Sequence, residues 1–177
     1  RQMCIRDRGR IGDEQLLVMN AEKASFTLQA EPGPEAPALS LLRRFSAPVN
    51  VQLEQPLQES LQLLAHDDDP FSRWDAGQRL ARQVLLARAA DQPDATVETA
   101  LISALRQRLS AYGGSGGQDL AILLALPGTA ELEALQNPVD PLALYAARRE
   151  WIADLGRHLS DPLHRLLERC RGDWAQA

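Results

Sequence analysis

The first side chains that could do chemistry lie in the segment HDDDPFSRWDAGQ, which begins at His66. Imidazole and carboxylate groups such as those of His66, Asp67, Asp68 and Asp69 ligate metal ions. Three consecutive carboxylates cannot all reach one ion, however, and no second His and Asp group completes a ligand shell at a recognisable spacing. Asp69 precedes Pro70, and an aspartate there caps the first turn of a helix. We therefore predict a helix start capped by Asp69, with Asp67 and Asp68 solvated and no metal ligands.

A second candidate is the sequence GGSGG at residues 113–117, which formally matches the G-x-S-x-G nucleophile elbow of hydrolases. The elbow requires a strand directly before the serine and a helix directly after it. The apolar pattern before Ser115 is helical and ends near Tyr112, so the glycines indicate a helix end and a flexible connector. A phosphate-binding loop is also disfavoured, because no Lys-Ser or Lys-Thr follows the glycines. We predict no catalytic residue here.

The elements that must position these segments are helical from Pro56 onward. Three prolines follow an aspartate at Asp69, Asp140 and Asp161, and each such pair is typical of a helix start. The predicted helices span residues 56–65, 70–89, 94–111, 118–126, 129–136, 141–159 and 162–171. Apolar residues recur at helical spacing in two stripes: Leu57, Leu61 and Leu64, and Val97, Leu101, Leu105 and Leu109. Antiparallel helices on short loops favour a superhelical array of the HEAT or armadillo kind, although no strict repeat is visible.

Before Pro56 the pattern is that of β-strands. Residues 24–30 and 49–54 alternate apolar and polar side chains, and shorter strands are predicted at residues 16–19 and 39–45. Residues 31–37, EPGPEAP, form a proline-rich loop. The fold class is therefore mainly α with a small β part, in which a partial antiparallel β-sandwich precedes the helices. Residues 1–10 follow neither the helical nor the strand period of apolar residues, and they resemble a translated sequencing-adapter peptide. We therefore expect a non-native segment without a packing partner.

Composition excludes several classes of function. The net charge is −5 over 177 residues, and Lys23 is the single lysine, so the basic stripe that binds nucleic acid is absent. The sequence has no apolar run of the roughly 20 residues that span a membrane. The two cysteines, Cys4 and Cys170, lie near opposite ends and form no C-x-x-C pair, which favours a reducing, cytoplasmic location.

Three segments resemble one family in the order expected for it. HDDDPFSRWDAGQ resembles the H-D-x-D-x-F-x-R-W-[E/D]-A-x-Q segment of bacterial-type aminopeptidase N, a family of zinc-dependent aminopeptidases. RRFSAPVNV at residues 43–51 resembles the F-S-A-P-V strand that closes the family's immunoglobulin-like sandwich domain, and NPVDPLALYAARREW at residues 137–151 is similar to a later helix. The resemblance implies that residues 11–54 are the C-terminal part of the sandwich domain. Residues 55–177 would begin the helical C-terminal domain.

The resemblance also implies what the longer parent protein does. The family removes N-terminal amino acids from peptides with zinc held by H-E-x-x-H and a later glutamate, and binds the substrate amine through G-x-M-E-N. None of these motifs occurs in this chain, and its histidines, His66, His158 and His164, do not lie at positions i and i+4. We therefore predict no catalytic, cofactor-binding or metal-binding residue in the chain.

Zinc is accordingly expected in the parent alone. The expected partner of this segment is the missing catalytic domain of the same chain, and the parent is expected to bind peptide substrates. We expect neither nucleic acid nor a membrane as a partner. The alternative function is an independent α-helical repeat module whose apolar groove binds another protein.

Overall fold

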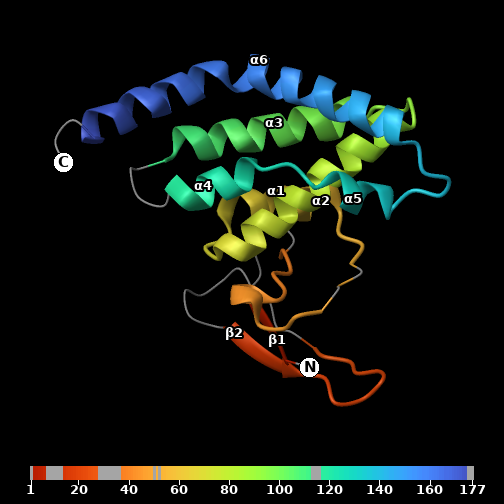
Figure 1. Ribbon diagram of the computed structural model, residues 1–177. Helices are drawn as coiled ribbons and strands as arrows, with labels where there is room; N and C mark the ends of the chain where they lie inside the picture. The colour runs from red at the N-terminus through yellow and green to blue at the C-terminus, as the bar shows by residue number, and fades with distance from the viewer. Residues whose placement is uncertain are drawn as a thin grey trace. The chain divides into compact units, whose positions relative to one another are not determined.

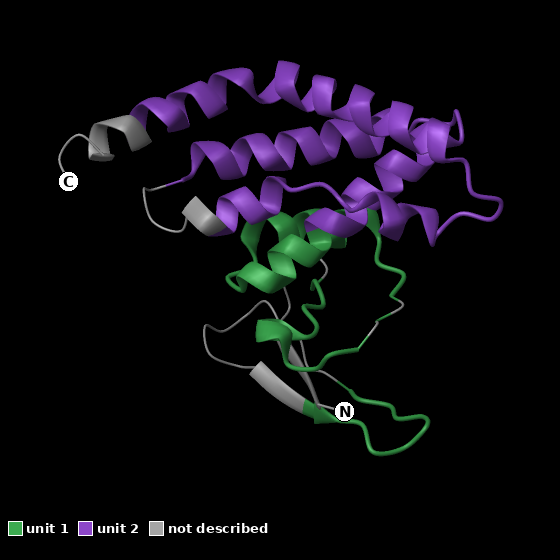
Figure 2. Ribbon diagram, viewed as in Figure 1, with its two compact units in different colours: residues 1–76 green, residues 77–177 purple. Residues whose placement is uncertain are grey.

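The computed structural model describes residues 2–6, 14–27, 37–49, 51, 53–112 and 117–174. The chain divides into two compact units, residues 1–76 and residues 77–177 (Figure 2). Most described residues are helical (Figure 1). The sequence-based boundary between residues 54 and 55, which separates the β pattern from the helical pattern, stays a prediction.

Unit 1 begins with a two-stranded antiparallel sheet. β1, Gln2–Arg6, pairs with β2, Glu14–Val18, so that Cys4 lies opposite Leu16. β2 overlaps the strand predicted at residues 16–19. The expectation that residues 1–10 lack a packing partner is wrong for Gln2–Arg6, because this strand pairs through its backbone with Glu14–Val18.

The remaining predicted strands do not form in the described residues. The strand predicted at residues 39–45 is wrong: Ser40 makes an isolated β-bridge, and η1, Arg43–Phe45, is a short 3-10 turn. Residues 24–27 are not in a strand, while residues 28–30 lie outside the described part of the chain. In the region predicted at residues 49–54, the described positions 49, 51, 53 and 54 are also irregular. A partial sandwich is therefore not seen among the described residues.

The helices follow the predicted positions closely. α1, Leu57–His66, begins after Pro56, whose carbonyl accepts a hydrogen bond from the Ser60 amide at 3.1 Å. α2, Pro70–Ala89, crosses the boundary between the two units. In unit 2 follow α3, Ala95–Ser110, α4, Gly117–Leu124, and α5, Thr129–Glu133, which ends before the predicted residue 136. None of the helices in the described part combines the length and apolar character that crossing a membrane requires.

α6, Pro141–Trp174, is one continuous helix with Pro162 inside it. The predicted helix start at Asp161 and Pro162 is therefore wrong, because Arg106 of α3 donates to the His158 carbonyl that Pro162 cannot reach with a backbone N–H. The Asp-Pro start at Asp140 is confirmed, since Asp140 accepts a hydrogen bond from the Ala143 amide at 3.0 Å. Asp94, which was expected only as the first residue of its helix, caps α3 by accepting hydrogen bonds from two of its amides.

The core of unit 2 lies where α3 and α5 pack against α6 (Figure 1). The predicted stripe of α3 is buried along its whole length, with exposed fractions between 0% and 6% for its four side chains. The largest fully buried residues of this unit are Val84, Leu85, Leu109, Pro127, Leu132, Leu144, Trp151 and Leu159. This packing holds together α3 and α6, the two helices that carry the acids of the charged cluster of unit 2 described below.

Candidate functional site

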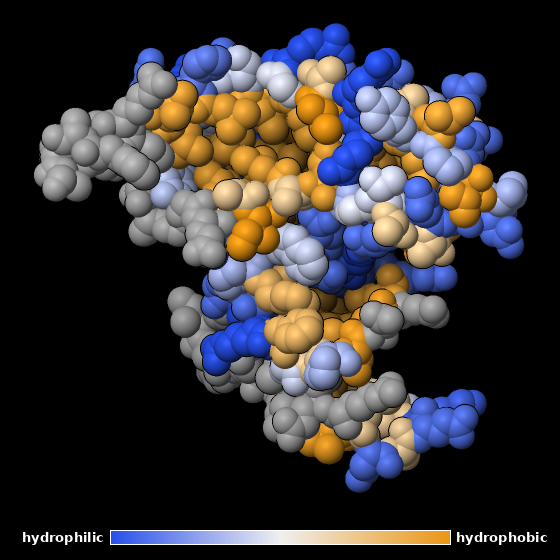
Figure 3. Space-filling model, viewed as in Figure 1, coloured by the Kyte–Doolittle hydropathy of each residue, from blue (hydrophilic) through white to orange (hydrophobic). Residues whose placement is uncertain are grey.

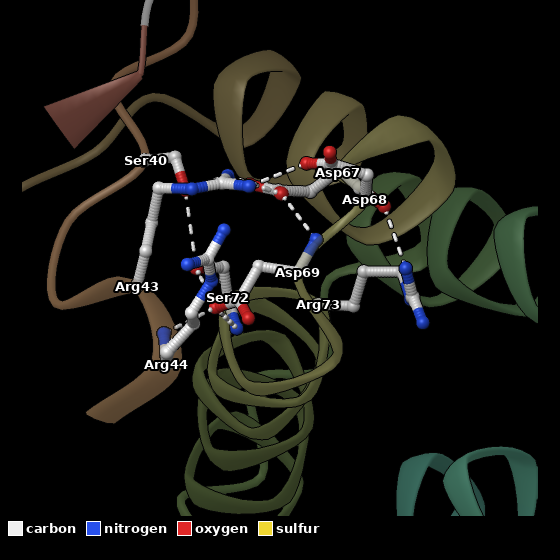
Figure 4. A network of polar contacts seen from close by, with 8 residues as sticks. All are labelled: Ser40, Arg43, Arg44, Asp67, Asp68, Asp69, Ser72 and Arg73. Atoms are coloured by element: carbon white, nitrogen blue, oxygen red, sulfur yellow. Dashed lines mark hydrogen bonds and ion pairs between the residues drawn. The ribbon is translucent and has the colours of Figure 1, made fainter. Parts of the chain in front are cut away.

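The acidic residues between α1 and α2 surround a buried arginine of η1 (Figure 4). Arg43 Nη1 lies 2.6 Å from Asp67 Oδ1, and Arg43 Nη2 lies 2.5 Å from Asp68 Oδ1. The side chains of Arg43 and Asp67 are each 3% exposed, whereas that of Asp68 is 60% exposed. Arg43 Nη1 also donates to Ser40 Oγ at 3.2 Å. The arginine thus joins the segment before η1 to the turn before α2.

Asp69 caps α2 as predicted. Its Oδ2 accepts from the Ser72 amide at 3.1 Å and from the Ser72 hydroxyl at 2.9 Å. The same oxygen accepts from the Arg44 amide at 3.0 Å. One carboxylate therefore satisfies a free amide of the helix start and an amide of η1, and complements the positive end of the helix dipole.

Asp67 departs from the prediction that it is solvated. Besides the ion pair with Arg43, its Oδ1 accepts from the Asp69 amide at 2.9 Å, and its carbonyl accepts from Arg73 Nη1 at 2.7 Å. No local pattern indicates this burial, because Arg43 lies 24 residues earlier in the chain. Asp68 keeps the exposed position that was predicted.

The donor set at this turn does not fit a metal ion. The inward oxygens of Asp67 and Asp69 already accept from a guanidinium and from backbone amides, and a cation would have to displace those positively polarised groups. His66 is exposed at the end of α1. Across the described ranges, no group of three or more His, Cys, Asp and Glu side chains is arranged to hold a metal ion.

The η1 backbone is strained, and the network holds it. Leu42, Arg44 and Phe45 have φ angles of 55°, 54° and 54°, in the left-handed region that side chains with a Cβ disfavour. Each such residue costs on the order of 1–3 kcal/mol and persists only where surrounding contacts determine it. Here those contacts are the bonds of Arg43 to the acids and of the Arg44 amide to Asp69.

Aromatic side chains form a second link between the same two segments. The rings of Phe45 and Phe71 meet edge to face with centroids 5.3 Å apart, and those of Phe71 and Trp74 lie 5.7 Å apart. Phe71 and Trp74 are three residues apart and lie on one face of α2. Trp74 is half-buried.

Unit 2 contains a separate charged cluster built on α2, α3 and α6. Arg88 Nε and Nη2 donate to the two oxygens of Glu98 at 2.7 and 2.8 Å, and Arg88 Nη2 lies 2.7 Å from Asp154 Oδ2. The guanidinium also stacks over the Trp151 ring, 4.9 Å from its centroid. Trp151 is fully buried, and its indole N–H has no hydrogen-bond acceptor among the described residues. Sequence reasoning missed this cluster, since its members are scattered among other charged residues.

The charges of the cluster stabilise one another. The hydrogen bond with Glu98 is the main cause that raises the pKa of Arg88; burial opposes it, and the hydrogen bond with Asp154 adds to it. Burial alone would raise the pKa of Asp154, but the hydrogen bonds and charges of Arg88 and Arg157 outweigh it and lower that pKa below its ordinary value. Ionised side chains held in this way position helices rather than transfer protons.

The remaining candidate residues are Ser115, His158 and His164. Residues 113–116 of GGSGG, including Ser115, lie outside the described part of the chain, and the element before them is α3, a helix rather than the strand of a nucleophile elbow. His158 and His164 are exposed on α6. The described side chains thus provide two positioning clusters, and none of the three histidines belongs to a group of described side chains that could hold a metal ion.

The stacked helices of unit 2 define the class of protein, an α-helical array of the armadillo kind. The family described as "Domain of unknown function (DUF3458_C) ARM repeats" matches residues 57–176, and the chain belongs to this family. The family match confirms the expected armadillo-like helical array for residues 57–176.

Curated relatives confirm the resemblance to aminopeptidase N. Aminopeptidase N of Caulobacter vibrioides is 39% identical over 145 residues, which cover 82% of this chain and 17% of that protein. Aminopeptidase N of Escherichia coli is 30% identical over 148 residues, with the same two coverages of 82% and 17%. Aminopeptidase N of Haemophilus influenzae is 28% identical over 173 residues, or 90% of this chain and 20% of that protein. The chain therefore spans 17–20% of the length of these relatives.

A solved structure agrees in fold. The crystal structure of Legionella pneumophila aminopeptidase A in complex with aspartic acid matches with a TM-score of 0.78 and 24% sequence identity. The match covers 96% of this chain and 20% of that chain.

Proposed function

We propose that this chain is a non-catalytic scaffold segment of a longer zinc aminopeptidase of the aminopeptidase N type. The observation that carries the proposal is the 39% identity to an aminopeptidase N over 82% of this chain but only 17% of that enzyme. The zinc motif H-E-x-x-H is absent from the sequence, and the acids of the described turn suit Arg43 rather than a metal. The parent would remove N-terminal amino acids from peptides in the cytoplasm, with zinc held by a catalytic domain elsewhere in the same polypeptide.

The arrangement of the segment within the parent is part of the proposal. Residues 11–54 would close the immunoglobulin-like sandwich domain, and residues 55–177 would begin the helical C-terminal domain. The Arg43 network supports this, because it ties residues of the first part to the turn between α1 and α2 in the second. A buried ion pair at that place would fix the first helices of the array on the preceding segment.

The outer face of α6 supports a scaffold role. The exposed large apolar residues of α6 are Leu142, Tyr145, Ile152, Leu163 and Leu167. Successive members of this set are 3, 7, 11 and 4 residues apart, which is close to whole numbers of helical turns, so they lie on one side of the helix. Figure 3 shows that apolar surface also gathers over other parts of unit 2. We propose that the apolar face of α6 packs against another part of the parent chain.

The proposal is tested by comparing this chain with the full-length parent recovered from the flanking DNA. The parent is expected to bind zinc and to release aminoacyl chromogenic groups in a chelator-sensitive reaction, whereas the 177-residue chain does neither. Ile152→Glu in the parent is expected to lower the yield of folded enzyme, while Glu150→Gln, an exposed change off this face, leaves it unchanged.

Two results would contradict the proposal. Chelator-sensitive turnover by the isolated chain would show that it carries catalytic groups of its own. A reading frame with its natural start and stop near residues 11 and 177, and without H-E-x-x-H, would favour the alternative of an independent helical module that binds a partner protein on the apolar face of α6.

A further inference from the structure

α6 runs through a proline without ending. Pro162 has no backbone N–H, so it cannot donate to the carbonyl of His158, the residue four positions earlier. A proline inside a helix removes this hydrogen bond and usually kinks or ends the helix at that point. The helix nevertheless continues to Trp174.

An arginine of α3 supplies a donor to the carbonyl that Pro162 leaves open. Arg106 Nη2 donates to the His158 oxygen at 2.6 Å. A guanidinium is a stronger donor than a neutral amide, and it is always charged. The contact takes the place of the missing backbone bond from a different helix, 52 residues away in sequence.

A second arginine makes the reciprocal contact. Arg169, on α6 beyond Pro162, donates through Nη1 to the carbonyl of Tyr112, just past the end of α3, at 3.0 Å. The partners of the two contacts are 52 and 57 residues apart in sequence. Moving from Arg106 to Tyr112 along the chain moves the partner from His158 to Arg169, so α3 and α6 lie side by side and run in the same direction (Figure 1). An arginine of α3 thus donates to a carbonyl of α6 before Pro162, and an arginine of α6 after Pro162 donates to the carbonyl of Tyr112, just past α3.

We propose that residues 158–162 of α6 form a hinge and that Arg106 closes it. The segment after the hinge, residues 163–174, stays aligned with α3 while Arg106 holds the His158 carbonyl. Without that contact, Pro162 leaves the helix one hydrogen bond weaker at a single point, and the segment opens as a unit. Arg106 is a positioning residue in this device, because it acts on the direction of α6 through the His158 carbonyl.

The test is amide hydrogen exchange of the 177-residue chain, read by position along α6. Arg106→Ala is expected to speed exchange of the amides at residues 163–169 about tenfold, with the amides of residues 145–152 unchanged. Gln107→Ala, an exposed neighbour on the same helix, is the matched control and is expected to change neither group.

Restoring the backbone donor separates a hinge contact from a general loss of stability. In Pro162→Ala, the residue at 162 donates to His158 itself, so adding Arg106→Ala should change exchange less than twofold. Equal effects of Arg106→Ala in both backgrounds, uniform acceleration along α6, or no acceleration would each overturn the proposal. If Arg106→Ala alone fails to fold, folding of the double variant supports the hinge and its failure to fold overturns it.

Discussion

Arg43 and Asp67 form an ion pair in which both side chains are only 3% exposed, with Nη1 and Oδ1 2.6 Å apart. The two residues belong to separate sequence segments that both resemble aminopeptidase N. A buried pair of this kind is worth little against an apolar replacement of both partners, but removing one partner leaves the other charge buried and alone. Its main effect is therefore to make the two segments depend on each other.

Removing the arginine should be costly. We expect Arg43→Ala to lower the free energy of unfolding by about 3–5 kcal/mol, because Asp67 would remain as a buried charge. Asp68→Asn is the control, since its side chain is 60% exposed, and should cost less than about 1 kcal/mol. Denaturant unfolding measures both. Equal costs for the two variants would show that the ion pair is not buried in solution.

The Asp-Pro pairs at Asp69 and Asp161 should behave differently. Asp69→Ala is expected to cost about 0.5–2 kcal/mol through the lost cap, with or without a chelator. Asp161→Ala should stay within about 0.5 kcal/mol, because Asp161 lies inside α6 rather than at a helix start. Unfolding curves with and without chelator distinguish these cases. A chelator effect as large as that of Asp69→Ala would point to a metal at this turn.

The two tryptophans should rank by burial. Trp151→Ala is expected to cost about 3–5 kcal/mol, because the fully buried ring leaves a large cavity. Trp74→Ala should cost less, since Trp74 is half-buried. Trp151→Phe is the matched variant: it loses no hydrogen bond of the indole N–H, so it should cost clearly less than Trp151→Ala. A larger cost for Trp74→Ala would reverse the order that burial gives.

Acid should weaken the Asp154 contacts. The pKa of Asp154 in the folded chain lies below its ordinary value of 3.8. The ionised carboxylate therefore adds stability at pH values above 3.8, and this stability is lost as the pH falls through the pKa of the folded chain. Asp154→Asn should therefore destabilise the chain most at about pH 6, and the difference from wild type should shrink below about pH 4. Urea unfolding at stepped pH measures this. A difference independent of pH would contradict the linkage.

Much of the helical part could be predicted from local signals. The stripe of α3 and the caps at Asp69 and Asp140 depend on residues within four positions of each other, and all appear in the structure. The start predicted at Asp161 failed although its local signal was the same. What differs there is a contact with Arg106, 52 residues before its acceptor, and local sequence carries no trace of it.

The same limit applies to the polar clusters. Asp67 looked solvated because its neighbours are acidic, and only the fold brings Arg43 onto it. The strand predicted at residues 39–45 has the composition of a strand, but the tertiary contacts of Arg43 and of the Arg44 amide select the left-handed turn of η1 instead. Strand propensity predicts the backbone poorly at η1, because tertiary contacts act on its adjacent residues.

The separation of α3 from α6 also matters while the chain is being synthesised. A ribosome adding roughly 5–20 residues each second makes Arg169 about 3–11 s after Tyr112, whose carbonyl it binds, given the 57 residues between them. A helix forms within about a microsecond, so α3 is complete long before its neighbour exists. During that interval the leucines of α3 lack the packing surface of α6 and are open to solvent or to a chaperone, and the translation speed between these residues sets how long this lasts.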